Sequence, residues 1–235
     1  MTVLLVVGII CCILVVLYLF AVRGRVGHTG LCELRDYAYA HRGLHDTKAA
    51  ENSLTAFTEA KRAGYGVELD VHLLADGNLA VIHDSSLQRT TGYEGYVEDL
   101  TAGELKNYFL EGTADTIPKF RDVLDLFAGS APIIVELKSV RNNYAKLCKA
   151  ACDMMDSYSG PYCMESFDPR CIRWLRKNRP EIIRGQLTEN YFVSACVSAC
   201  AHQHRNKGDQ NDLRCQGILK RLNDSGGKGC ADHKE

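Results

Sequence analysis

The chain of 235 residues lacks the sequence patterns that mark several classes of protein. None of its 11 cysteines belongs to a Cys-x-x-Cys pair, so we do not expect a structural zinc site. Their number is odd and their spacing irregular, which argues against a secreted disulfide framework and favours a reducing compartment. The formal net charge is -1, and nucleic-acid binding would require a basic surplus, so we expect no nucleic-acid partner.

Charged residues are missing from residues 3–22, which form one apolar run. A helix of about 20 residues spans the roughly 30 Å hydrocarbon core of a bilayer. A secretory signal peptide would carry basic residues before a shorter run and small residues at a cleavage site. No Lys or Arg precedes this run, and the bulky residues 17–20 lie near its end. We therefore expect an uncleaved transmembrane anchor within residues 1–25.

The residues that flank this run predict its orientation. Arg23 and Arg25 follow the run closely, whereas only the α-amino group precedes it. Basic residues beside a membrane helix tend to stay on the cytoplasmic side. The sequence therefore predicts a single-pass membrane protein whose C-terminal part lies in the cytoplasm.

Strand-like and helix-like segments alternate between residues 36 and 189. The strand-like segments are Ala38–Arg42, Val67–Leu74, Leu79–His83, Pro132–Leu137, Tyr162–Ser166 and Ile182–Leu187. Helices are expected from Leu54, after Pro118, over Asn143–Met155, over Pro169–Lys177 and, briefly, at the Thr101–Glu104 capping box. This alternation indicates an α/β fold with a parallel sheet, for which a (β/α)8 barrel of the TIM type is one solution. That barrel needs eight strands and about six are recognisable, so we expect it to be incomplete at its C-terminal end.

Acidic residues occupy alternate positions of the second strand-like segment. Glu68 and Asp70 are two residues apart, so both side chains point to one face of a strand, and His72 continues the row. Glu136 lies late in another strand. Buried carboxylates repel one another unless a cation lies between them, and three carboxylates suit Mg²⁺ or Ca²⁺. A half-exposed strand with ordinary surface charges shows the same alternation, so this segment alone leaves both interpretations open.

Two histidines and two basic residues lie at the ends of the predicted strands. His41 and His83 can serve as acid and base, because imidazole titrates near neutral pH. Arg42 and Lys138 can hold a phosphate, Arg through its bidentate fork and Lys as a point charge. Each of them alone would be interpreted as a solvated charge at a strand end. Together, beside the carboxylates, they indicate a catalytic site.

The order and spacing of these residues resemble the glycerophosphodiester phosphodiesterase family over about residues 37–187. The matching motifs are His41-Arg42-Gly43, Glu51-Asn52-Ser53, Glu68-Leu69-Asp70-Val71, Asp76-Gly77, His83-Asp84, Arg89-Thr90-Thr91-Gly92, Ile117-Pro118, Glu136-Leu137-Lys138 and Ser166-Phe167-Asp168-Pro169. An ordered series of this kind is far more specific than any single motif.

The resemblance implies a (β/α)8 barrel that hydrolyses glycerophosphodiesters to glycerol phosphate and an alcohol with one divalent cation, Mg²⁺ or Ca²⁺. A lysophospholipid is the alternative substrate. The implied site residues are the metal ligands Glu68, Asp70 and Glu136, the acid and base His41 and His83, the phosphate-binding Arg42 and Lys138, and Glu51 in support. Glu51 would either ligate the cation or orient Arg42. Which histidine is the base, and which alcohol is released, are left open.

The sequence departs from the family pattern after Thr188. The family continues with two more strand–helix units, but residues 190–235 show neither, and only Asp212–Leu222 has the pattern of a helix. Cys196, Cys200, His202 and His204 fit no standard zinc spacing. We expect a divergent tail, disordered or partly helical, or out-of-frame sequence after a real domain.

Three functional interpretations follow from the sequence. The first is a membrane-tethered, metal-dependent glycerophosphodiester phosphodiesterase. The second is an enzyme like phosphatidylinositol phospholipase C, which shares the two-histidine chemistry, although the Glu68 and Asp70 row favours the first. The third is a truncated, inactive relative that acts as a membrane-bound interaction module, as the missing strands would suggest. The sequence does not predict an oligomeric state.

Overall fold

The computed structural model describes residues 2–21 and 30–188, and within the first helix it describes the side chains from Leu5 to Leu17. The flanking Arg23 and Arg25, and the tail over residues 190–235 with its expected helix and its Cys and His residues, lie outside the described residues. The chain begins with α1 (Thr2–Ala21). Within residues 2–21 and 30–188, no helix is long and apolar enough to cross a membrane. The anchor stays a prediction.

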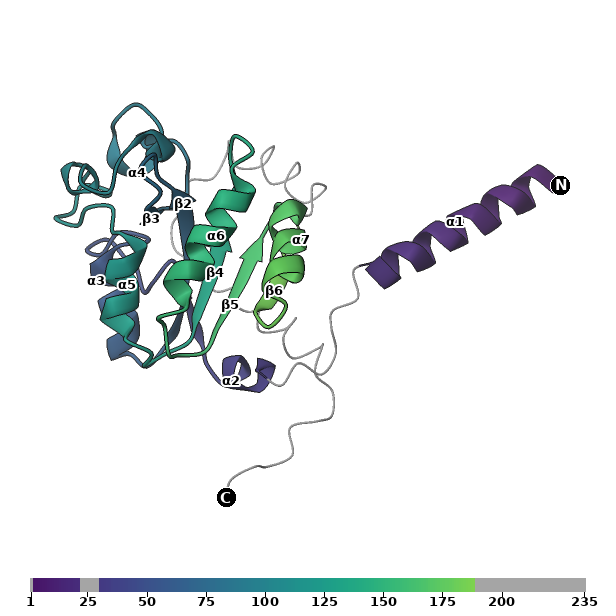
Figure 1. Ribbon diagram of the computed structural model, residues 1–235, viewed down its shortest axis with the longest axis horizontal. Helices are drawn as coiled ribbons and strands as arrows, with labels where there is room; N and C mark the ends of the chain where they lie inside the picture. Colours follow the sequence, from purple (N-terminus) through teal and green to yellow (C-terminus); the bar gives the residue numbers. More distant parts are fainter. Residues whose placement is uncertain (1, 22–29, 189–235) are drawn as a thin grey trace, which may run out of the picture.

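A single sheet forms the centre of residues 30–188 (Figure 1). After α2 (Leu31–Arg35), the parallel strands lie in the order β1 (Tyr39–His41), β2 (Gly66–Leu73), β4 (Ile133–Leu137), β5 (Tyr162–Ser166) and β6 (Ile183–Gln186). The six expected strands are all present, with β3 (Leu79–Val81) paired to β2. Within residues 30–188 the sheet is open, and β1 and β6 are its edges.

The main helices connect the parallel strands and lie near the positions expected from the sequence. They are α3 (Leu54–Arg62), α5 (Phe120–Phe127), α6 (Tyr144–Met155) and α7 (Pro169–Asn178). Ser53 caps α3, because its Oγ accepts a hydrogen bond from the Ala56 N–H at 3.1 Å. Asp168 caps α7 in the same way, with Pro169 in the first turn.

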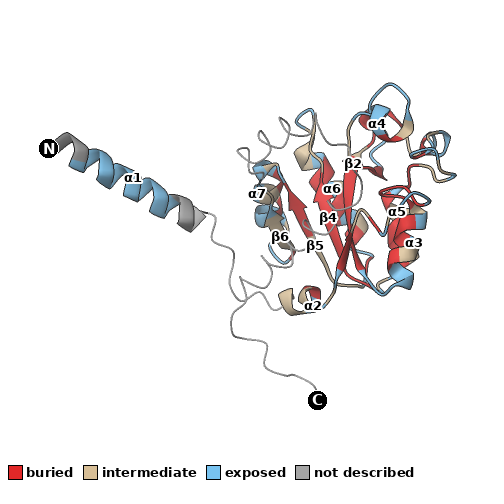
Figure 2. Ribbon diagram, turned by 180° about the vertical axis from the view of Figure 1, so that it is seen from behind, coloured by how far each residue is buried: buried red, intermediate tan, exposed pale blue. Residues whose placement is uncertain are grey.

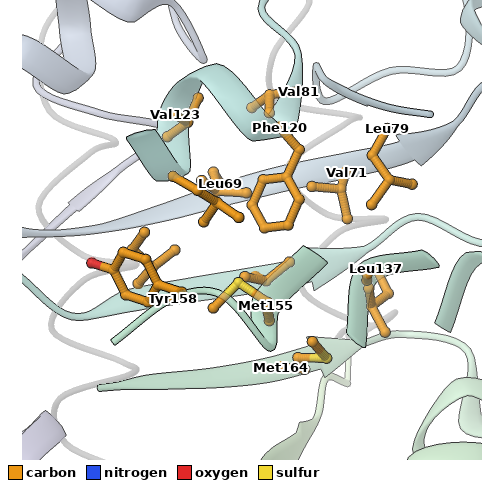
Figure 3. Close-up of a cluster of buried hydrophobic side chains, with 14 of the residues drawn as sticks. Leu69, Val71, Leu79, Val81, Phe120, Val123, Leu137, Met155, Tyr158 and Met164 are labelled. Carbon is orange, nitrogen blue, oxygen red and sulfur yellow. The ribbon is translucent and has the colours of Figure 1, made fainter. Parts of the chain in front are cut away.

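The hydrophobic core lies between the sheet and these helices (Figure 3). Leu69 and Val71 of β2 face Phe120 and Val123 of α5 in this cluster. Because strand side chains alternate, the even-numbered residues of β2 point to the opposite face. That face is also buried, as the red colour of β2 and β4 in Figure 2 shows. The fold therefore holds the acidic row of β2 away from solvent.

The third strand corrects one expectation. Leu79–His83 was expected to follow the other strands in a parallel sheet, but β3 runs antiparallel to β2 and ends at Val81. The reason is the tight turn at Asp76 and Gly77, where Gly77 has φ +85°. A turn this short joins only antiparallel strands. His83 therefore lies in the loop after β3 and not at a strand end.

The segment between β3 and α5 has little regular structure and its own small core. It contains α4 (Gln88–Thr91) and two short 3₁₀ turns, Val97–Asp99 and Leu105–Asn107. The Glu104 carboxylate accepts the Thr101 N–H at 2.7 Å, as the capping box predicts, but only a 3₁₀ turn follows and not an α-helix. The segment packs through a second buried cluster made of Ala50, Leu74, Ala80, Ile82, Leu87, Val97, Leu100, Leu105, Leu110 and Ile117.

Among the described residues, Cys148, Cys152 and Cys171 are buried free thiols. Buried thiols of this kind do not identify the compartment, so the cytoplasmic location stays a prediction.

Candidate active site

Three carboxylates meet between the two central strands. The register of β2 against β4 places Asp70 opposite Glu136, and Glu68 lies two residues before Asp70 on the same face. All three side chains are buried, and one oxygen from each lies within 4.8 Å of the others. The half-exposed alternative for this strand is therefore wrong. The structure brings the three predicted metal ligands together.

The two predicted phosphate-binding residues flank this cluster. The Lys138 ammonium lies 3.0 Å from Asp70 Oδ1 and 2.6 Å from Glu136 Oε1. Arg42 Nε lies 3.5 Å from Asp70 Oδ2, and the Arg42 backbone N–H donates to Glu68 Oε2 at 3.1 Å. Two cationic side chains thus face three buried carboxylates, and the cluster keeps an excess of negative charge.

The pKa values of these carboxyl groups reflect that excess. Burial raises the pKa of Glu68 well above its usual value, and the charges of Asp70, Glu165 and Glu136 add to the effect. Burial also raises the pKa of Glu136. Burial acts in the same direction on Asp70, but Lys138, His83 and Arg42 outweigh it and hold the Asp70 pKa below its usual value. Without further positive charge, the cluster favours binding a proton.

The donor set fits a hard divalent cation. Carboxylate oxygens are the ligands that Mg²⁺ and Ca²⁺ prefer, and here they lie close together in a buried place. Asp70 Oδ1 is buried and forms no hydrogen bond, and its contact with Lys138 Nζ at 3.0 Å is an ion pair. That oxygen keeps lone pairs for a ligand. Glu68, Asp70 and Glu136 would hold the cation.

The two predicted catalytic histidines lie beside the cluster. His41, the last residue of β1, places Nε2 at 3.7 Å from Glu68 Oε2. His83 follows Ile82, whose N–H donates to the Asp70 carbonyl, and its Nδ1 lies 2.5 Å from Asp84 Oδ1. Burial lowers the pKa of His83 despite the opposing charge of Asp70. Its imidazole is therefore suited to accept a proton near neutral pH.

Glu51 contacts Arg42, as the expected role of orienting Arg42 requires. Glu51 Oε2 accepts a hydrogen bond from Arg42 NH1 at 3.0 Å, and its Oε1 accepts one from Arg89 NH2 at 2.5 Å. Both oxygens are therefore engaged with arginines. The pKa of Glu51 is lowered, because these two arginines outweigh the effect of burial.

Two residues at the site were not predicted from the sequence. Asn52 Nδ2 donates to Asp70 Oδ2 at 2.8 Å, with the Asn52 side chain buried. Glu165 is buried on β5, where the register places it opposite Glu136. The alternation of Cys163 and Glu165 in a strand-like segment is the sequence signal that would have identified Glu165.

His72 continues the row on β2 as expected, but it does not join the carboxylate cluster. Its Nδ1 lies 2.5 Å from Glu98 Oε1, and its Nε2 lies 3.1 Å from the carbonyl oxygen of His83. Ser85 Oγ donates to the other oxygen of Glu98 at 2.7 Å. His72 therefore supports the loop that carries His83.

The fold and the site define an α/β protein with a TIM-barrel-like parallel sheet and a buried carboxylate cluster on its central strands β2 and β4. The chain belongs to the glycerophosphoryl diester phosphodiesterase family, whose model matches residues 41–202.

Individual relatives agree with this assignment. A glycerophosphodiester phosphodiesterase of Bacillus altitudinis is 44% identical over 110 residues, which are 43% of this chain and 44% of the relative. One of Caldanaerobacter subterraneus is 34% identical over 167 residues, which are 66% of this chain and 67% of the relative. The chain thus spans under half of the first relative and about two thirds of the second.

A solved structure shares the fold. It is an Oleispira antarctica phosphodiesterase in complex with the product sn-glycerol-3-phosphate, and the likeness has a TM-score of 0.63 at 22% identity. It covers 82% of this chain and 74% of the other.

Proposed function

We propose that this chain catalyses the metal-dependent hydrolysis of glycerophosphodiesters to glycerol phosphate and an alcohol. The observation that carries the proposal is the buried cluster of Glu68, Asp70 and Glu136, with Arg42 and Lys138 in direct contact. A phosphodiester brings a negative charge that needs such cations, and its reaction needs an acid and a base nearby.

The chemistry divides among the residues of the site. Glu68, Asp70 and Glu136 would hold a cation, which would supply positive charge for the phosphoryl oxygens. Arg42 and Lys138 orient the diester through its oxygens. His83, whose pKa burial lowers, accepts the proton of the attacking water or of the glycerol hydroxyl. His41, beside Glu68, donates a proton to the departing alkoxide.

Turnover of glycerophosphocholine by the full chain tests the proposal. We expect activity with Mg²⁺ or Ca²⁺ and none in chelator, and His41→Ala should lower kcat by about 10²–10⁴-fold, as loss of a general acid does. Lys149→Ala is the control, because Lys149 forms an exposed ion pair with Asp153 on α6. Turnover that persists in chelator, or an undiminished kcat in His41→Ala, would contradict the mechanism.

Other substrates separate the remaining interpretations. Lysophosphatidylcholine tests the lysophospholipid alternative, and phosphatidylinositol tests an activity like that of a phosphatidylinositol phospholipase C. A folded chain that turns over none of the three substrates, with either cation, would support the inactive interaction module.

The apolar N-terminal run supports a further part of the proposal, a membrane anchor over residues 3–22 with the catalytic part in the cytoplasm. The support is the charge-free sequence, its helical conformation in α1 and the following Arg23 and Arg25. Carbonate extraction of membranes should leave the full chain in the pellet and release a chain that lacks residues 2–25. Protease added to sealed vesicles then reports the orientation. A full chain released by carbonate contradicts the anchor.

A further inference from the structure

Arg89 lies between two carboxylates that come from different loops. It belongs to α4, and its side chain is 46% exposed. Its NH2 donates to Glu51 Oε1 at 2.5 Å, and its Nε donates to Asp84 Oδ2. Glu51 precedes α3, whereas Asp84 follows β3, so Arg89 connects the loop after β1 with the loop after β3.

Each of these carboxylates holds a functional residue with its second oxygen. Glu51 Oε2 accepts from Arg42 NH1 at 3.0 Å, and Asp84 Oδ1 lies 2.5 Å from His83 Nδ1. The contacts form one series of alternating basic and acidic side chains: Arg42, Glu51, Arg89, Asp84 and His83. Arg89 is the central member of this series.

The two residues at the ends of this series, Arg42 and His83, must be oriented correctly to function. Arg42 must direct its fork at the diester, and Glu51 restricts this long side chain. A carboxylate at Nδ1 fixes the tautomer and the ring orientation of His83, which leaves Nε2 for proton transfer. The pKa of Asp84 is lowered to about 2, because Arg89 and His83 outweigh the effect of burial. Asp84 is therefore a fully charged partner for both.

We infer that Arg89 is a positioning residue that couples the phosphate-binding Arg42 to the histidine base His83 through Glu51 and Asp84. The inference rests on the proposed function, since it assigns Arg89 a place in that reaction. Arg89 does not contact the carboxylate cluster and acts only through its two partners.

The competing explanation is an ordinary surface ion pair, which contributes little to stability and affects no reaction. The chain offers a matched control for it. Arg179 also bridges two carboxylates with the same atoms, Nε to Glu181 and NH2 to Asp156, both at 2.5 Å. Asp156 precedes β5 and Arg179 precedes β6, so this pair lies at the opposite end of the strands from the site.

The experiment compares Arg89→Gln with Arg179→Gln in the full chain. We expect Arg89→Gln to lower kcat/KM for glycerophosphocholine on the order of 10²-fold, the usual cost of a slightly misplaced group. Arg179→Gln should leave kcat/KM unchanged, while the two variants lose similar amounts of Tm. Arg89→Lys should fall between wild type and Arg89→Gln, because one ammonium cannot reproduce the two-donor fork. Equal kcat/KM in the Gln variants overturns the inference.

A double-mutant cycle shows whether Arg89 acts through Asp84. Residues that work as one unit give non-additive losses. We expect Arg89→Gln to reduce kcat/KM much less in an Asp84→Asn background than in the wild type. Additive losses overturn the coupling, even if Arg89→Gln alone impairs the enzyme.

Failure of the proposed function is distinguishable from failure of the inference. If wild type turns over no diester, the proposed function fails, and the NMR signals of the His83 imidazole become the readout. Signals that change in Arg89→Gln but not in Arg179→Gln support the coupling. Identical spectra overturn it.

Discussion

Asn52 contributes to the site through both its side chain and its backbone. Its Nδ2 donates to Asp70 Oδ2 at 2.8 Å, and its φ of +56° is a left-handed conformation that Asn tolerates better than Ala. We expect Asn52→Ala to lower the free energy of unfolding by about 2–4 kcal/mol. Cation affinity, measured by calorimetry, should fall about 10–100-fold, as for other residues that orient a metal ligand.

A glycine at the same position separates the two contributions of Asn52. Asn52→Gly removes the hydrogen bond but accepts the left-handed backbone without strain. It should lose as much cation affinity as Asn52→Ala and less stability. If both variants bind the cation as wild type does, Asn52 has no role in holding Asp70.

Glu68 should make cation binding dependent on pH. Its pKa is raised by burial and neighbouring carboxylates, so the cation-free protein holds a proton that the unfolded chain has lost. Stability of the cation-free form should therefore fall as the pH rises from the ordinary carboxyl range through this raised pKa. A bound cation needs the ionised carboxylate and displaces the proton.

Calorimetry in buffers of different ionisation enthalpy measures this displacement. We expect proton release on adding Mg²⁺ or Ca²⁺, and we expect the release to decline as the pH is raised. A binding heat that is the same in all buffers across the acidic range would show that Glu68 is already ionised.

Individual site residues were predictable where the local sequence spacing alone determines where they lie. Glu68 and Asp70 were predicted because period-two alternation places both on one face, and the structure confirms this placement. The hydrogen bond from Asn52 was not predictable, because its partner is 18 residues away and only the tertiary fold brings them together. The same holds for His72 and Glu98, which are 26 residues apart.

At the scale of elements, the loop between β1 and α3 must approach the helix closely. Gly43 has φ +80°, and a Cβ placed there would lie 2.9 Å from the backbone carbon and from Cβ of Ala56. Left-handed strain costs an L-residue about 1–2 kcal/mol, and overpacking adds about 1–3 kcal/mol. We expect Gly43→Ala to lower the free energy of unfolding by the sum of these two amounts. Urea unfolding measures this loss.

Gly77 provides the control for this substitution. It has φ +85° in the turn between β2 and β3, and a Cβ there would meet nothing within 4 Å. Gly77→Ala should therefore lose only the amount due to strain. Equal losses in the two variants would show that the contact with Ala56 relaxes at no cost.

The elements were predictable where burial gives a strong periodic signal. β5 has the predicted bounds, and β4 and α6 differ from their predictions by one residue at the start. The direction of β3 was misjudged, although the short turn before it carried the information. The segment after β3 packs through scattered apolar residues with no period, so its short turns left no clear signal.

At the scale of the whole molecule, the site depends on residues from separate parts of the chain. β2 and β4 supply the carboxylates, β1 ends in His41, and the loop before α3 carries Asn52. The arrangement follows from the parallel register, which sets Asp70 opposite Glu136. Repulsion among these buried charges opposes folding, so a cation between them should stabilise the whole sheet.

This reasoning predicts a rise in Tm with divalent cations. At a concentration of about 100 times Kd, binding to the folded state contributes about 2.7 kcal/mol, which corresponds to a rise of about 5–10 °C for a domain of this size. The effect should be absent in Asp70→Asn, because this variant loses one of the three charged ligands. Potassium at equal ionic strength should also have no effect. An equal rise in wild type and Asp70→Asn would assign the stabilisation to general screening, and the carboxylates would then be a source of repulsion only.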